Sequence, residues 1–127
     1  MNNLKFRVWD KKLQILGTVS NIDFEFEEVT FYIDDEEELD VSQTFKDVEI
    51  MQSTGLFDKN GVEIFEGDIV RNTHTGSVGR VHWCVHNTGF FYYVEKDKKD
   101  YTVFRAKYNL EVIGNIYENK ELLENDR

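Results

Sequence analysis

The stretch DKNGVEIFEGDIV, residues 58–70, decides the fold. Asn60-Gly61 predicts a tight turn, because Asn and Gly both tolerate the positive φ that hairpin turns require. The apolar pair Ile64-Phe65 comes next, and a second glycine, Gly67, precedes Ile69-Val70. The stretch therefore predicts a hairpin turn followed by the start of a further strand.

Regularly spaced short strands are predicted after this stretch. They cover residues 68–73, 78–85, 90–95, 102–105 and 112–116, with turns rich in Gly or in Lys and Asp between them. Five short strands at this spacing predict a small antiparallel barrel. Phe90, Tyr92 and Val94 alternate with other residues and are expected to fill its core. Leu122 and Leu123 lie among charged residues and predict a short terminal helix.

The N-terminal part is also expected to be rich in strands. Apolar residues alternate with polar ones over residues 4–9 and again over residues 22–27, as in half-buried strands. Residues 34–40 read DDEEELD and predict a solvated acidic loop or the start of a short helix. We therefore expect a mainly β protein, α+β at most. Its β-rich N-terminal portion is predicted at residues 1–60, and the barrel with its terminal helix at residues 61–127.

The balance of charge restricts the functions that fit. The chain has 25 acidic and 15 basic residues, a formal charge of −10, and 13 of the acids lie in residues 1–50. Proteins that bind nucleic acid without sequence preference show the opposite sign, and an anionic membrane would repel this chain. Cys84 is the one cysteine and the N-terminus lacks a signal peptide, so a reducing cytoplasm is expected.

Three segments resemble the YopX family, small proteins encoded by bacteriophages and prophages. They are KFRVWD at 5–10, IMQSTGLFDKNGVEIFEGDIV at 50–70 and EVIGNIYEN at 111–119. Their order and spacing match the family over nearly the whole chain. Lys120 departs from it, because the family commonly has a proline at the start of the last helix.

The resemblance implies a β-rich portion followed by an SH3-like barrel that begins at the GDIV segment. It also implies homo-oligomers, and it implies no reaction. The glycines and apolar residues of the signature serve turns and a core, so the signature specifies a fold rather than a chemistry.

One group of residues could bind a metal. His82, Cys84 and His86 are spaced so that a strand would place all three side chains in a row on one face, with Val81, Trp83 and Val85 on the opposite, buried face. Such residues can ligate zinc, and His74 could add a ligand. Three ligands in a straight row do not easily close a tetrahedron, so the alternative is a solvent-facing polar row. No cofactor is predicted.

Two further binding functions stay open. The acidic N-terminal portion could imitate DNA phosphates and inhibit a host enzyme that acts on nucleic acid. The aromatic and basic residues of 90–101, with nearby Arg71, Arg80, Arg105 and Lys107, could instead stack on single-stranded nucleic acid through the barrel, although Asp97 and Asp100 weaken that field.

The sequence contains no GxSxG motif, no Walker-type loop and no dinucleotide-binding fingerprint. No catalytic residue is predicted. The favoured interpretation is a non-enzymatic prophage accessory protein that binds a host or phage protein and associates with itself.

Overall fold

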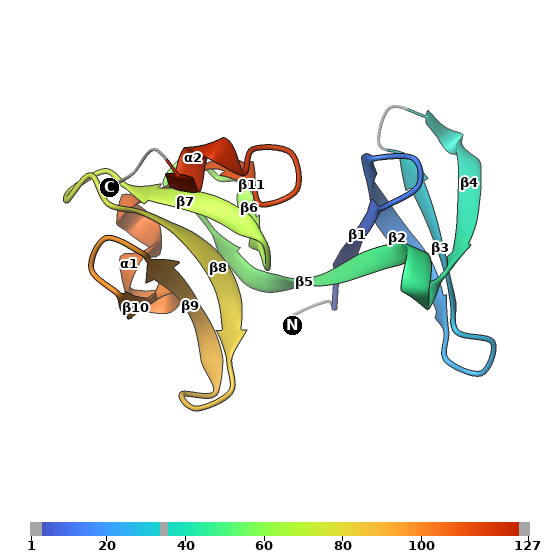
Figure 1. Ribbon diagram of the computed structural model, residues 1–127, viewed down its shortest axis with the longest axis horizontal. Coiled ribbons are helices and arrows are strands. Elements are labelled where there is room, and N and C mark those ends of the chain that lie inside the picture. The colour runs from blue at the N-terminus through green and yellow to red at the C-terminus, as the bar shows by residue number, and fades with distance from the viewer. Residues whose placement is uncertain (1–3, 34–35, 125–127) are drawn as a thin grey trace. The chain divides into compact units, whose positions relative to one another are not determined.

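The computed structural model describes residues 4–33 and 36–124, and for residues 36–39 it describes the backbone alone. The chain divides into two compact units, Met1–Gln52 and Ser53–Arg127 (Figure 1). The division falls within strand β5 (Val48–Phe57), which pairs with β1 (Phe6–Asp10) before it and with β6 (Glu63–Phe65) after it. The predicted boundary at residues 60–61 lies later in the chain.

The first unit is built on antiparallel strands. After β1 come β2 (Ile15–Asp23), β3 (Glu28–Ile33) and β4 (Glu36–Thr44), and the 3-10 helix η1 (Phe45–Asp47) leads into β5. The strands of this unit follow the order β4-β3-β2-β1-β5. Its core contains Val8, Val29, Phe31 and Val48. Gly17 admits the Phe31 ring, since a Cβ there would lie 2.1 Å from Phe31 Cδ2.

The prediction of a solvated acidic loop or helix start at residues 34–40 is wrong for residues 36–40. These residues form the start of β4, which pairs with β3 through Tyr32–Asp40 and Ile33–Glu36. Residues 34–35 lie outside the described part of the chain. An edge strand needs only one partner, and its other side can face solvent, so a charged sequence is compatible with it and discourages pairing with other sheets.

The strand predicted over residues 22–27 also ends earlier than expected. β2 ends at Asp23, whose Oδ1 accepts hydrogen bonds from the backbone N–H groups of Glu25 (3.0 Å) and Phe26 (3.1 Å). This local bonding turns the chain back into β3. Phe24 and Phe26 therefore lie in the turn, where they are 76% and 68% exposed.

The second unit contains a five-stranded antiparallel sheet. Its order is β10-β9-β8-β7-β11, so the last strand returns beside the first. The strands are β7 (Asp68–Asn72), β8 (Val78–Cys84), β9 (Gly89–Val94), β10 (Lys99–Thr102) and β11 (Leu110–Asn115). This connectivity agrees with the SH3-like unit expected from the sequence, and the mainly β prediction is confirmed.

Short helices complete the second unit. α1 (Val103–Ala106) and the 3-10 helix η2 (Lys107–Asn109) join β10 to β11, and α2 (Glu121–Glu124) follows near the C-terminus. The strand predicted at residues 102–105 is wrong, because pairing with β9 ends at Thr102 and the chain then turns helical with Val103 fully buried. Tyr92 and Val94 are 3% and 0% exposed, which confirms their predicted place in the core.

The signature residues serve the fold through hydrogen bonds as well as packing. Asp58 Oδ1 accepts the N–H groups of Asn60 (2.8 Å) and Val62 (2.9 Å), and its Oδ2 accepts that of Val112 on β11 (2.8 Å). Asn115 Oδ1 likewise accepts two N–H groups of the following turn. These side chains accept hydrogen bonds from backbone N–H groups that are only partly open to solvent.

Candidate functional site

The structure does not bring His82, Cys84 and His86 into one row. β8 ends at Cys84, so the strand alternation stops before His86, which lies exposed in the following turn. Cys84 is 7% exposed and accepts a hydrogen bond from Asn87 Nδ2 (3.4 Å). His82 Nε2 lies 2.7 Å from Asp100 Oδ1.

The opposite face of that strand also differs from the prediction. Val81 is 2% exposed, as expected, whereas Trp83 and Val85 are 44% and 75% exposed. Among residues 4–33 and 40–124, whose side chains the structure describes, no group of three or more His, Cys, Asp and Glu side chains is placed to hold a metal ion.

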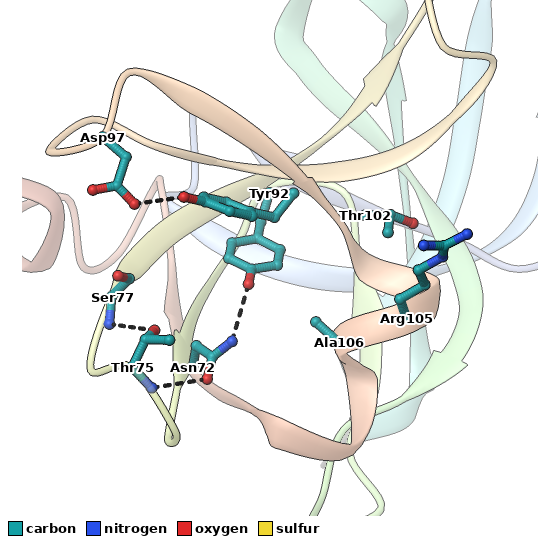
Figure 2. A pocket seen from close by; sticks show the side chains of 9 residues that line it. Asn72, Thr75, Ser77, Tyr92, Asp97, Thr102, Arg105 and Ala106 are labelled. Atoms are coloured by element: carbon teal, nitrogen blue, oxygen red, sulfur yellow. Dashed lines mark hydrogen bonds between the residues drawn. The ribbon is translucent and has the colours of Figure 1, made fainter.

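The second unit carries a pocket of about 400 Å³ (Figure 2). Its lining comes from the end of β7, the β7–β8 turn, β9, the β9–β10 turn, β10 and α1. The lining residues are Asn72, Thr75, Ser77, Tyr92, Asp97, Tyr101, Thr102, Arg105 and Ala106. This volume lies in the range of known ligand-binding pockets, and the mixture of aromatic, hydroxyl and charged groups is typical of them.

Two tyrosines form the aromatic wall. The Tyr92 and Tyr101 rings stack with centroids 5.5 Å apart and planes inclined by 28°. Asn72 Nδ2 donates to the Tyr92 hydroxyl (3.2 Å), and the Tyr101 hydroxyl donates to Asp97 Oδ2 (2.7 Å). Both rings are therefore fixed at their polar ends as well as by stacking, so the wall is preorganised.

The hydrogen bond to Asp97 raises the pKa of Tyr101 above its ordinary value, and desolvation adds to the effect. The Tyr101 phenol therefore stays protonated at neutral pH and remains a hydrogen-bond donor to the carboxylate.

Arg105 is the basic residue that lines the pocket, and it lies opposite the Asp97 carboxylate (Figure 2). Figure 2 shows Asp97 and Arg105 on opposite sides, with Thr102 beside the Arg105 guanidinium. Arg105 is exposed and makes no hydrogen bond or ion pair with any residue that the structure describes. Its five N–H donors face solvent and fit an external carboxylate or phosphate.

The surroundings of the pocket are basic although the whole chain is acidic. Residues 96–107 contain five basic and two acidic residues in a chain of formal charge −10. Both acids have partners: Asp97 accepts from Tyr101, and Asp100 lies against His82. The positive charge near Arg105 is thus only weakly compensated at close range.

Sequence reasoning found part of this site. Tyr101 and Arg105 were both in the predicted aromatic and basic surface, but Asn72, Thr75 and Ser77 were not. Asn72 belongs to no recognisable sequence motif. Its side-chain amide bonds to the backbone of the β7–β8 turn and to the Tyr92 hydroxyl, and these contacts arise only in the folded structure. Only the packing of β7 against β9 through β8 brings these residues together.

These features define a two-part, mainly β protein with a pocket on its second, SH3-like unit. The chain belongs to the YopX protein family, whose model matches residues 5–124. It is similar in structure to protein EF1440 from Enterococcus faecalis, with 27% identity and a TM-score of 0.66, over 97% of this chain and 99% of that one.

The fold is also that of protein yopX from Bacillus subtilis, which is 24% identical with a TM-score of 0.60, over 97% of this chain and 99% of that one. No curated protein sequence matches the chain. None of the helices within residues 4–33 and 36–124 has the length and apolar character needed to cross a membrane.

Proposed function

We propose that this chain is a prophage-encoded accessory protein that acts by binding proteins, including further copies of itself, rather than by catalysis. The observation that carries the proposal is the exposed pair Phe24 and Phe26 in the β2–β3 turn, 76% and 68% exposed. Turns are usually polar, and exposed aromatic side chains grouped in one place are typical of interaction sites.

Burial of these rings would contribute favourably to the association free energy. Full burial of a Phe side chain contributes roughly 1.5–3 kcal/mol, so two rings contribute roughly 3–6 kcal/mol. Phe24 already contacts Phe45 edge-on, with ring centroids 6.0 Å apart and planes inclined by 77°. This contact restrains Phe24 before binding, which lowers the entropy lost when a partner covers it.

Sedimentation velocity over a range of protein concentrations tests the proposal. The wild-type chain is expected to associate as its concentration rises, and the double variant Phe24→Ser, Phe26→Ser to dissociate at least tenfold more readily. Phe57→Ser is the matched control, because Phe57 is also exposed (52%) but lies in β5. A strictly monomeric wild type at high concentration that also captures no host or phage protein would contradict the proposal.

Two other binding functions remain as secondary candidates, each with its own observation. Arg105 without a described partner favours single-stranded nucleic acid, and a gel-shift series at low salt tests it. The acidic residues of the first unit favour imitation of DNA, and inhibition of a host nuclease or polymerase by the purified protein tests that.

A further inference from the structure

We propose that the pocket of one copy receives the β2–β3 turn of a second copy, with Phe24 or Phe26 against the tyrosine wall and the neighbouring glutamates on Arg105. This inference rests on the proposed self-association and names the two surfaces that perform it. The turn is defined here as residues 23–28, DFEFEE, and the basic rim as residues 96–107.

The pocket fits an aromatic side chain in shape and in chemistry. Its volume of about 400 Å³ accommodates one phenyl ring and part of the chain that carries it. The Tyr92 and Tyr101 rings and the Ala106 methyl group supply apolar surface at its wall. Figure 2 shows Tyr92 and Ala106 among the lining side chains. Aromatic rings prefer edge-to-face or offset contacts with other rings, which a phenyl group entering beside a stacked tyrosine pair can make.

The charges of the two surfaces are complementary. The turn carries four acids and no base, whereas the rim carries five bases and two acids that already have partners. Glu25 and Glu27 are exposed on either side of Phe26. A phenyl ring seated in the pocket would bring a flanking carboxylate toward the guanidinium of Arg105, which forms bidentate pairs with carboxylates.

The same charges oppose turn-to-turn and rim-to-rim contacts between two copies. Two copies that met turn to turn would bring eight acids together, and two basic rims would repel each other in the same way. Each copy offers one turn and one pocket, so two copies can dock reciprocally in a twofold dimer or successive copies can dock head to tail. Head-to-tail contacts continue from copy to copy until the assembly closes into a ring or grows as a filament.

Charge exchange between the two surfaces provides the test. One variant carries Glu25→Lys with Glu27→Lys, and a second carries Arg105→Glu. Each variant alone opposes like charges at the contact and is expected to sediment as a monomer at concentrations where the wild type assembles. An equimolar mixture restores opposite charges at both contacts and is expected to reassemble, with affinity lowered by sodium chloride.

Lys120→Glu is the matched control, since it makes the same change of charge at an exposed residue of the second unit outside the pocket. It is expected to assemble like the wild type, and circular dichroism confirms that every variant is folded.

If the wild type assembles but both charge variants assemble equally well, this docking is wrong and self-association by another surface stands. If the folded variants are monomeric and their mixture stays monomeric, the docking is also overturned. A monomeric wild type contradicts the docking and the self-association together.

Discussion

The Asp58 carboxylate offers the sharpest test of how the signature specifies the fold. It is 6% exposed and accepts three backbone N–H groups, two in its own turn and one from Val112, 54 residues along the chain. Asp58→Asn keeps the shape of the side chain. In the variant, one end is still a carbonyl oxygen for the turn, but the other end is an amide that faces the Val112 N–H donor.

The expected loss follows from the hydrogen bonds that each variant removes. A hydrogen bond to a charged group contributes roughly 1.5–3 kcal/mol, so Asp58→Asn should lower the free energy of unfolding by about 2 kcal/mol. Asp58→Ala removes all three acceptors and should lower it by about 3–5 kcal/mol, since water reaches part of the exposed turn. Both effects are large against a total stability of about 5–15 kcal/mol.

The assay is a urea series followed by the NMR amide signals of the second unit, so that unfolding of the first unit does not enter the measurement. Glu111→Gln is the control, because its partly exposed ion pair with Arg71 contributes less than about 1 kcal/mol. If Asp58→Asn unfolds at the same urea concentration as Glu111→Gln, the bond to Val112 does not hold β11 and the reasoning fails.

Further predictions concern close packing and a carboxylate pKa. Gly79→Ala places a Cβ 2.6 Å from the Tyr93 carbonyl oxygen and should lower the free energy of unfolding by about 1–3 kcal/mol in a urea series. In Gly89→Ala the nearest atom is 3.4 Å from the new Cβ, so the change should stay within about 1 kcal/mol. Equal losses in the two variants would contradict this packing. The hydrogen bond from Thr44 is the main cause that lowers the pKa of Asp47, so Thr44→Val should raise that pKa toward its ordinary value in an NMR titration. The stabilisation by the ionised Asp47 is present above its ordinary pKa and is lost as the pH falls through the lowered pKa. The free energy of unfolding of the variant should therefore be reduced mainly at neutral pH. An unchanged Asp47 pKa in the variant would disprove the role of Thr44.

The sequence predicted well where local chemistry decides the structure. Asn60-Gly61 forms the expected turn, with Gly61 at φ 80°, because this conformation depends on residues adjacent in the chain. Tyr92 and Val94 alternate along β9 and are buried as expected. Fold class followed from the number and spacing of such segments.

Other features depend on local interactions that compete with the pairing of strands, and an alternating sequence pattern does not reveal them. Phe24 and Phe26 fit a strand by alternation, but Asp23 bonds to the backbone two and three residues ahead and ends it. Cys84 is buried at the end of β8, where Asn87 Nδ2 donates to its sulfur, and the chain turns before His86. At Asp23 a side-chain to backbone bond ends the alternation, and at Cys84 the alternation ends with the strand itself.

The pocket was beyond sequence reasoning for a different reason. Its tyrosine wall and Arg105 lie close in the chain, but the opposite lining comes from the end of β7 and the turn after it. The pairing of β7 with β8 and of β8 with β9 brings them together. Side-chain volumes and strand register decide whether a hollow remains there, and neither follows from composition.

Photo-crosslinking between two labelled copies measures the proposed contact most directly. A benzoylphenylalanine replaces Phe26 in a ¹⁴N chain, which is mixed with a ¹⁵N chain of wild-type sequence, irradiated and digested for mass spectrometry. We expect the main product to join the probe to a ¹⁵N peptide that lines the pocket, within residues 72–77 or 92–106, and to decrease when the ¹⁵N chain carries Arg105→Glu. A product that maps outside the pocket lining, or the absence of products that join ¹⁴N to ¹⁵N peptides, would contradict the docking of one copy into another.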